Sequence, residues 1–458
     1  MPHCNRLGLS LLLVATLGAP TSAQSRIYVD AAAPTSGDGS TWAKAFPSLQ
    51  SALSAAGPGA AVWVAQGTYS GGFTVPASVT LVGGFRAGDT RVTQRDVGDN
   101  ATILDGGDFQ RVLVLGNASV VDGFFVQRGR AGAPGGGGAL CLGGSAVIRN
   151  CGFLANNITA GRGSALYVGR DSSGRGADPL VENSLFVDNG NGTKLGHAID
   201  VEYSAGTFRN VTVDRNRDNG LHLQNGCTTR IVNSTFTNNS GRGVCHIDAA
   251  TQPTLSHCHF FGNTIALLHY RGVDYTQLAQ VNALSYATNN IEGDPRYTDP
   301  SKLDYSLQPN SPLIDAGTNV PGAATLDVDG NSRWLDGKRT GTANIDIGPI
   351  EFSNLYLDLL GTPKAGNTVR IDSDGATGTP MLMAVALQVA ATPFFLPQLG
   401  FVHADLGTGI VLGWANVGTA VPVAIPNGLP AGTAVVFQGV AGTATWGNSS
   451  DPLDVRLQ

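Results

Sequence analysis

The middle of the chain repeats a short pattern of apolar and polar positions. Five segments align, starting at residues 150, 183, 210, 233 and 257, and they read NCGFLANN, NSLFVDNG, NVTVDRNR, NSTFTNNS and HCHFFGNT. The segment DGFFVQRG at residue 122 fits as an earlier, degenerate copy. Each copy has an apolar residue three positions after its start, and Gly or Asn turns and a second apolar strand follow it; these residues are Phe125, Phe153, Phe186, Val213, Phe236 and Phe260. Strand-rich units that recur every 23 to 33 residues predict a solenoid with one β-helix coil per unit.

The residue that opens each copy is usually asparagine. Asparagine is favoured in turns, and identical amides stacked between coils can bond to one another. We therefore interpret the column that begins at Asn150 as a structural ladder of amides at a turn.

The segment before the repeat reads as a cap for the open end of a solenoid. Phe46, Leu49, Ala52, Leu53 and Ala56 recur at helical spacing. The stretches AVWVAQGTY and SVTLVGGF then read as strands closed by Gly turns. An uncapped coil would expose strand edges and core, so a short amphipathic helix has a physical role here.

This combination resembles the right-handed parallel β-helix proteins of secreted bacterial origin, in the pectate-lyase-like superfamily. The pieces SPLIDAGT, DVDGN and DIGPIEF, within residues 289–352, resemble the closing segment common at the end of such proteins. The resemblance implies an all-β fold: a single-stranded parallel β-helix with an N-terminal helical cap. The chain carries no residue-by-residue match to the catalytic motifs of pectate lyases or polygalacturonases, so the resemblance implies the fold and no activity.

Four regions follow along the chain. Residues 1–23 have a charged end, an apolar core and a small-residue cleavage site, which predicts a signal peptide and an extracellular or cell-envelope location. The others are 24–99 (cap and first coils), 100–352 (β-helix with closing segment) and 353–458. Short apolar runs between Gly and Pro turns predict a small β-sandwich for the last region, and it resembles C-terminal domains of secreted planctomycete-like proteins.

Composition narrows the range of partners and cofactors. Only 14% of residues are charged and the net charge is −6, which argues against nucleic acid. No stretch after the signal is apolar over a membrane-spanning length. Five cysteines remain after the signal, an odd number, so at least one is free or pairs with another chain. Asp327, Asp329 and Asn331 have the spacing of a calcium loop, but a plain turn is favoured because Gly330 is misplaced for an EF-hand.

Aligning the second strand of each coil on its inward apolar residues defines two outward columns. The first column is Cys141, Tyr167, Asp200, His222, His246 and His269. The second, two positions further on, is Gly143, Gly169, Glu202, Gln224, Asp248 and Arg271. The connections that lead into these strands hold Lys194, His197, Asp214, Arg217 and Asp218. Corresponding residues stack about 4.8 Å apart in a parallel coil, so a continuous polar stripe is predicted.

The stripe suggests several functions. The interpretation that we favour is a polar face that binds carbohydrate or another surface protein, because many solenoid faces bind without turnover. The alternative is a polysaccharide lyase or glycoside hydrolase. Its catalytic candidates are Asp200, His222 and His246. Its substrate-binding candidates are Lys194, Glu202, Gln224, Asp248, His269, Arg271 and Arg217.

The sequence suggests two ways in which the stripe could bind a cation. A lyase often uses calcium to neutralise a uronate carboxylate, and Asp200, Glu202 and Asp248 are the candidates for it. No dedicated metal site is predicted, although His222 and His246 with Asp200 are an alternative set for a transition metal.

Overall fold

The structure, a computed structural model, describes residues 25–33, 37–192, 195–338, 340 and 342–352, and the strands alone between residues 356 and 456. The predicted signal peptide lies outside the described residues. In the part of the chain that is described, no helix is both long and apolar enough to cross a membrane.

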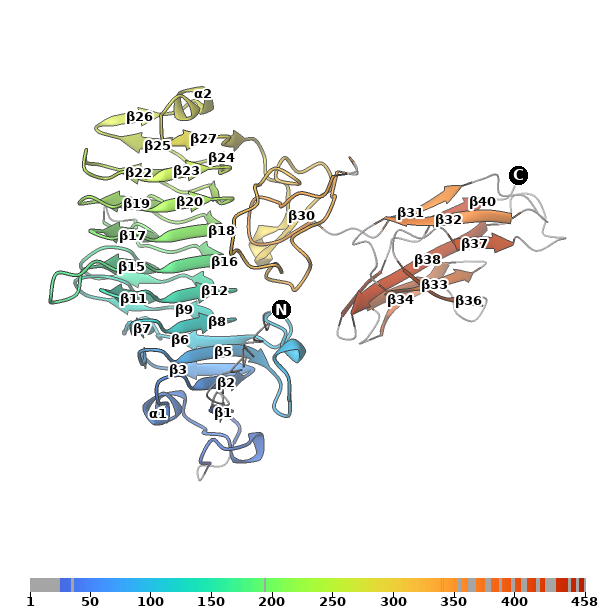
Figure 1. Ribbon diagram of the computed structural model, residues 1–458, viewed down its shortest axis with the longest axis horizontal. Coiled ribbons are helices and arrows are strands. Elements are labelled where there is room, and N and C mark those ends of the chain that lie inside the picture. The colour runs from blue at the N-terminus through green and yellow to red at the C-terminus, as the bar shows by residue number, and fades with distance from the viewer. Residues whose placement is uncertain are drawn as a thin grey trace, which may run out of the picture.

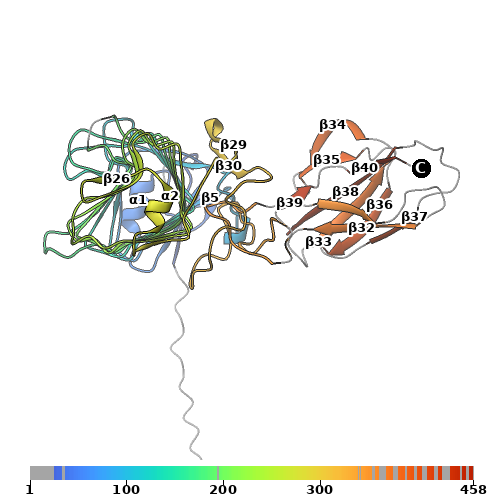
Figure 2. The same ribbon diagram turned by 90° about the horizontal axis from the view of Figure 1, so that it is seen from above.

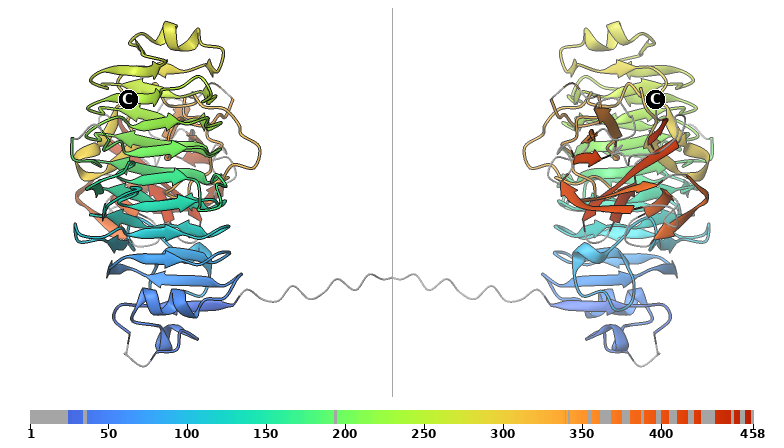
Figure 3. Two further views of the ribbon diagram at one scale, coloured as in Figure 1. Left: turned by 90° about the vertical axis from the view of Figure 1, so that its left-hand side faces the viewer. Right: turned by 90° about the vertical axis from the view of Figure 1, so that its right-hand side faces the viewer.

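The chain winds as a parallel β-helix with a flat face on one side and a bent face on the other (Figure 1). The flat face is a nine-stranded sheet of β4 (Phe73–Val75), β7 (Leu113–Leu115), β11 (Ala139–Leu142), β15 (Leu166–Gly169), β17 (Ile199–Glu202), β19 (Leu221–Gln224), β22 (Arg242–His246), β25 (Ala266–Tyr270) and β26 (Val273–Tyr275). The strands of this sheet pair in parallel up to β25, whereas β26 returns antiparallel to it. Figure 3 (left) shows the strands rising in chain order up the coil.

The bent face is a seventeen-stranded sheet that supplies the other two sides of each coil. Its first strands are β1 (Arg26–Val29), β2 (Ala61–Ala65), β3 (Gly67–Ser70), β5 (Thr80–Phe85), β6 (Thr102–Asp105), β8 (Val120–Asp122) and β9 (Phe125–Gln127). The repeat supplies β12 (Val147–Arg149), β13 (Gly152–Leu154), β16 (Leu180–Val187), β18 (Thr207–Asp214), β20 (Arg230–Val232), β21 (Thr235–Thr237), β23 (Thr254–Ser256), β24 (His259–Phe261), β27 (Ala287–Thr288) and β28 (Ile291–Glu292). The remaining short elements are β10 (Arg130–Ala131), β14 (Asn157–Ile158), β29 (Tyr297–Asp299), β30 (Asp304–Leu307) and the 3₁₀ turns Trp42–Lys44, Val92–Gln94 and Pro300–Lys302.

Short helices lie over both ends of the coil, as the view from above shows (Figure 2). Helix α1 (Leu49–Ala55) buries Leu49, Ala52 and Leu53, which confirms the predicted amphipathic cap. Helix α2 (Leu278–Asn282) buries Val281 at the opposite end. The two helices cover core residues that would otherwise meet water.

Aromatic and aliphatic side chains stack in register inside the coil. Phe153 lies on Phe186 with 4.8 Å between ring centroids, and Phe236 lies on Phe260 at 5.7 Å. The predicted repeat register is confirmed for these residues, because they occupy equivalent positions in the sheet. It is wrong by one residue for the earliest copy, where Val126 and not Phe125 pairs with Phe153.

The asparagines that open each repeat form the corner of the bent face and not the main amide ladder. Asn150, Asn183, Asn210 and Asn233 all have φ between 48° and 52°. This left-handed conformation is one that asparagine tolerates better than most residues. Only Asn183 bonds to the corner asparagine of the coil before it, with 3.3 Å from its Nδ2 to Oδ1 of Asn150.

The amide ladder lies six residues further along each repeat. Its members are Asn156, Asn189, Asn216, Asn239 and Asn263. In the first four members, Nδ2 donates to Oδ1 of the next asparagine at 2.9 to 3.1 Å. It also donates to a backbone carbonyl of the coil before it, as Asn216 does to Phe186 at 2.9 Å. The predicted ladder therefore exists, but the prediction placed it in the wrong column.

The closing segment runs back along the bent face rather than over the end of the coil (Figure 1). Asn183, Asn210 and Asn233 donate from Nδ2 to the carbonyls of Leu326, Gly348 and Thr318 at 3.0, 3.2 and 2.8 Å respectively. The buried Arg333 guanidinium joins the segment together, because it bonds both Glu351 Oε1 at 2.7 Å and Asn183 Oδ1 at 2.5 Å. The corner asparagines thus bind the segment that covers them.

The candidate calcium loop in this segment is a turn. One carboxylate oxygen of Asp327 accepts from the backbone N–H of Asn331 at 2.7 Å, and the other accepts from that of Glu351 at 2.9 Å. Asp327 is buried and holds the loop to the end of the segment. The favoured interpretation of this stretch as a turn is confirmed.

The strands after the closing segment pair only antiparallel to one another. They are β31 (Tyr356–Leu360), β32 (Thr368–Asp374), β33 (Pro380–Ala386), β34 (Val389–Leu396), β35 (Gly400–Ala404), β36 (Ile410–Asn416), β37 (Val421–Ala424), β38 (Ala434–Thr443), β39 (Trp446–Ser449) and β40 (Leu453–Arg456). Their packing as a β-sandwich stays a prediction.

The five cysteines between residues 141 and 258 are free and buried. Burial raises the pKa of the Cys151 and Cys258 thiols to about 12, so both are neutral at ordinary pH. They serve as small apolar side chains of the coil interior.

His246 points into the coil, contrary to the predicted outward column. In the observed register, His222 pairs with Cys245 and Leu223 pairs with His246. His246 is 0% exposed, stacks on Tyr270 at 4.3 Å and bonds the Tyr286 hydroxyl at 2.5 Å. The alignment treated Cys245 and Ile247 as the inward pair, but Ile247 is 46% exposed. A slip of one residue exchanges the two faces of a strand, and Cys141 is misplaced for the same reason because Leu140 pairs with Tyr167.

We predict that Asn216→Ala lowers the free energy of unfolding by at least about 3 kcal/mol, because it leaves several buried donors and acceptors unpaired at once. Urea denaturation followed by circular dichroism measures the loss. Asn117→Ala is the matched control, since Asn117 is exposed and its side-chain oxygen accepts a bond from the Ser145 N–H. Its cost should stay below about 1 kcal/mol. An equal cost for both variants would contradict a structural role of the ladder.

We also predict that stability falls on acidification from pH 7 to pH 4. Burial lowers the pKa of both His246 and His259 to about 4, so the unfolded chain, with ordinary histidine pKa values near 6.5, binds more protons than the folded chain in this window. Each histidine contributes a loss on the order of 3 kcal/mol. His246→Phe keeps an aromatic ring in the stack and should make the melting temperature less sensitive to pH. An unchanged pH dependence in this variant would contradict a buried, neutral His246.

Candidate functional site

The outward face of the nine-stranded sheet carries a column of polar side chains. The pairing places Tyr167, Asp200, His222, Cys245 and His269 on successive strands. The predicted positions of Tyr167, Asp200, His222 and His269 are therefore confirmed, and Cys245 replaces His246 in the column.

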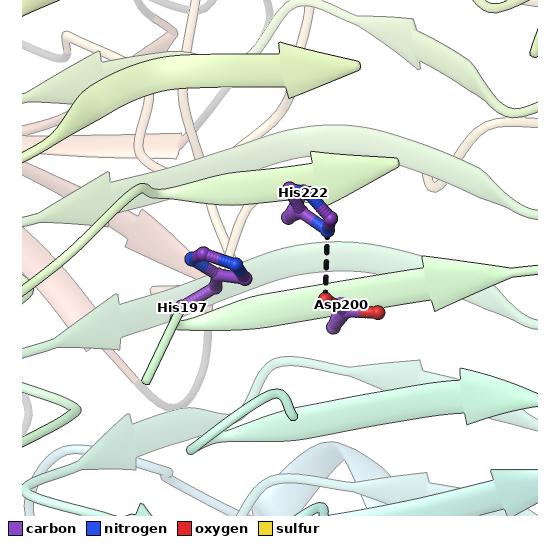
Figure 4. Close-up of side chains that lie close together, drawn as sticks. All are labelled: His197, Asp200 and His222. Atoms are coloured by element: carbon purple, nitrogen blue, oxygen red, sulfur yellow. Dashed lines mark hydrogen bonds and ion pairs between the residues drawn. The ribbon is translucent and has the colours of Figure 1, made fainter. Parts of the chain in front are cut away.

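The centre of the column is a buried cluster of His197, Asp200 and His222 (Figure 4). Nδ1 of His222 lies 2.8 Å from Oδ2 of Asp200. The rings of His197 and His222 stack with 4.3 Å between centroids and 23° between planes. The three side chains are 4%, 0% and 4% exposed, so most of their surface is withdrawn from water.

Adjacent coils bring these residues together. Asp200 on β17 and His222 on β19 are direct neighbours in the sheet. His197 lies three residues before Asp200, in the connection that enters β17. Its carbonyl accepts bonds from the backbone N–H and the hydroxyl of Ser164 at 2.7 and 2.9 Å, which fixes it over the strand. Sequence analysis placed His197 on the connection without assigning it to the site, and the signal available was its spacing from Asp200.

Both imidazoles are oriented by carboxylates. Oδ2 of Asp218 lies 3.0 Å from Nδ1 of His197, and the Asn219 side-chain amide lies 3.2 Å from the same nitrogen. His222 is held by Asp200. Burial lowers the pKa of His222, and the neighbouring Asp200 carboxylate opposes that shift. Nδ1 of each ring thus has a carboxylate oxygen within 3.0 Å.

A glycine lets the preceding coil approach the cluster closely. Gly163 has φ of +64°, and a Cβ there would lie 2.3 Å from the carbonyl oxygen of Leu166 and 3.2 Å from the backbone nitrogen of Asp200. A larger residue would clash with the Leu166 carbonyl and would also be tight against the backbone of β17. Gly163 therefore contributes to the burial of the site.

The second column provides a more exposed polar group beside the cluster. Glu202 pairs with Gln224 in the sheet, and its carboxylate accepts a bond from the Tyr167 hydroxyl and another from the Asn225 side chain, the latter at 2.8 Å. The next residue, Tyr203, is 41% exposed and has the Arg170 guanidinium 3.9 Å from its ring centroid. These groups form a polar and aromatic rim at the carboxyl ends of β17 and β19.

The other predicted members of the stripe lie apart from the cluster. Asp248 caps a turn, where it accepts from the backbone N–H groups of Asn225 at 2.6 Å and Thr251 at 2.9 Å. Arg271 lies 4.9 Å from the ring centroid of Tyr270. Nδ1 of His269 lies 2.6 Å from Asp274. His246 therefore lies on the opposite face of the sheet from Asp200, and the predicted part of Asp248 in ligand binding stays a prediction.

The predicted residues on the connections do not join the cluster either. Asp214 faces the closing segment and accepts from the Tyr305 hydroxyl at 2.7 Å. Arg217 is exposed, and Lys194 lies outside the described residues.

The proposed calcium ligands are not brought together. Asp200, Glu202 and Asp248 engage His222, Asn225 and the turn at Thr251 respectively. Among the described residues, the one group of His, Cys, Asp and Glu side chains close enough to share a metal ion is His197, Asp200 and His222. Their ligand atoms all lie within 4.8 Å of one another.

Comparison with known proteins bears on the fold. A family model described as the right-handed β-helix region matches residues 119–286. No curated protein matches the chain. Among solved structures, the chain is similar to tailspike protein 2 of Escherichia coli O157:H7 bacteriophage CAB120, with 10% sequence identity and a TM-score of 0.31. The alignment covers 92% of this chain but only 65% of the tailspike. The tailspike protein of Acinetobacter phage vB_ApiP_P1 is 11% identical with a TM-score of 0.26, over 86% of this chain and 74% of that protein. The family match and the parallel coils together show that residues 119–286 of the chain fold as a right-handed parallel β-helix.

Proposed function

We propose that the protein binds carbohydrate at the outward face of β15, β17 and β19. The observation that carries this proposal is the rim at Glu202, where the carboxylate bonds the Asn225 amide and the Tyr167 hydroxyl and the next residue, Tyr203, exposes its ring. Sugars present hydroxyls to hydrogen-bonding groups and an apolar face to aromatic rings, so the chemical types match. The parallel pairing of β15, β17 and β19 repeats these polar positions from one coil to the next.

The exposed ring of Tyr203 is the main apolar contact in this proposal. Arg170 lies over the ring, so a sugar would occupy the free side of the tyrosine or displace the guanidinium. Glu202 is held by two neighbours and is therefore preorganised to accept a bond from a hydroxyl. Preorganisation lowers the ordering cost of binding a flexible polysaccharide.

The protein is further proposed to act outside the cytoplasm. The support for this is the charged, apolar and small-residue pattern of residues 1–23, which is typical of an exported chain. A surface protein partner is the second ligand class that the same face could contact.

A specific observation favours catalysis as the second candidate function. The Asp200 carboxylate on Nδ1 of His222 leaves Nε2 as the proton-accepting atom, which is the arrangement of a general base. A lyase or hydrolase would need the substrate to reach this ring, and His222 is 4% exposed. Binding at the rim makes no such demand, so binding is the function that we favour.

We predict that Tyr203→Ala weakens binding to a polysaccharide about tenfold, which corresponds to about 1.4 kcal/mol from one lost ring contact. Titration against immobilised neutral and acidic polysaccharides measures the affinity. Trp334→Ala is the matched control, because Trp334 is also exposed (44%) but lies on the closing segment. Absence of binding across the panel, or an equal loss in the control, would contradict the proposed surface.

Turnover is tested separately from binding. If the second candidate is right, the protein releases reducing ends or unsaturated uronates from one of these polysaccharides. His222→Gln should then abolish the reaction and leave affinity unchanged. Binding without any new product in the wild-type protein would exclude catalysis on that substrate.

A further inference from the structure

Within the described parts of the chain, no lysine or arginine forms an ion pair with Asp200 of the cluster or with Asp218 beside it. The only ion-pair partner of Asp200 among the described residues is the imidazole of His222, and that of Asp218 is the imidazole of His197. Buried charges in proteins are normally paired or coordinate a metal, so this cluster has the charge pattern of a cation site.

The donor types select the kind of cation. Two imidazoles and one carboxylate are typical ligands of zinc and related first-row divalent ions, whereas calcium and magnesium prefer oxygen alone. All three ligand atoms lie within 4.8 Å of one another on adjacent coils. Three protein ligands also leave a fourth tetrahedral position for water or a bound molecule.

The surroundings of the cluster resemble the outer shell of a metal site. Metal-bound imidazoles usually engage a carboxylate or carbonyl through the other ring nitrogen. Asp218 and Asn219 both lie near Nδ1 of His197, which leaves Nε2 of that ring for a metal. Oδ2 of Asp218 is buried and makes no hydrogen bond, so its contact with His197 is its one polar interaction in the described structure.

We propose that His197, Asp200 and His222 form a binding site for a divalent transition metal, with Zn²⁺ as the favoured ion. Asp218 is the positioning residue that orients His197. Ligands of a tetrahedral zinc ion at 2.0 to 2.2 Å lie roughly 3.4 Å apart. The ligand atoms of the cluster lie within 4.8 Å of one another, and Nδ1 of His222 is 2.8 Å from Oδ2 of Asp200, so zinc binding requires the side chains to shift and this hydrogen bond to open. The stacked rings must also turn about their Cβ–Cγ bonds, since a metal lies in the plane of each imidazole that binds it. This assignment does not depend on carbohydrate binding.

The first test uses the full-length protein after treatment with a chelator and dialysis. Zinc is added in the presence of a chromogenic competitor, and bound metal is measured by elemental analysis. We expect about one zinc ion per chain and a rise in melting temperature that grows with zinc concentration. Absence of stoichiometric binding of zinc, cobalt, nickel and copper would overturn the proposal.

Variants then identify the ligands. His197→Gln and His222→Gln should each remove stoichiometric zinc, and Asp218→Asn should weaken zinc binding about 10- to 100-fold through the orientation of His197. His257→Asn is the matched control: His257 has φ of 50° at the corner where the other coils carry asparagine, so the change removes a histidine without altering the backbone preference. Zinc retained in both ligand variants, or lost equally in the control, would overturn the assignment.

A spectroscopic test needs no variant and covers the case in which a ligand variant does not fold. Cobalt added to the wild-type protein should give visible bands of tetrahedral intensity that zinc then removes. A weak octahedral spectrum that zinc does not change would mean that the ion binds elsewhere, and the proposal would be wrong.

Discussion

The coil depends on parallel hydrogen bonding that stays in register from one turn to the next. Backbone bonds hold neighbouring strands together, but a strand can slip along its partner and exchange its two faces. The asparagine ladder opposes such a slip because the inner amides bond both to the coil before them and to the coil after them, as Asn216 does. An amide displaced by one residue would be buried without partners. Stacking of Phe153 on Phe186, and of Phe236 on Phe260, adds apolar contacts that need the same register.

This register also creates the site. Asp200 and His222 meet only because residues 22 apart become direct neighbours on β17 and β19. The cluster is then enclosed by the connections, where Ser164 and Gly163 bring the preceding coil over His197 and Asp200. Rigid strands therefore supply two of the three ligating groups, and a short tethered connection supplies the third.

Repeat spacing was sufficient to predict the fold class, the coil length and most of the outward column. Spacing failed at His246, because alternation does not distinguish a buried histidine from an outward one when its neighbours Cys245 and Ile247 are both apolar. It also placed the ladder at Asn150 rather than Asn156, since both positions carry asparagine in most copies. The position of His197 depends on how the connection before β17 folds back over the sheet. The connections differ in length from coil to coil, so an alignment of the strands does not predict it.

The closing segment limits how the solenoid could change in length. It bonds three successive corner asparagines, Asn183, Asn210 and Asn233, through carbonyls of Leu326, Gly348 and Thr318. A whole coil duplicated between residues 183 and 233 would shift these asparagines relative to a segment of fixed length and break the set of contacts. A coil added before Asn150 would leave them intact. The segment therefore fixes the number of coils between residues 183 and 233.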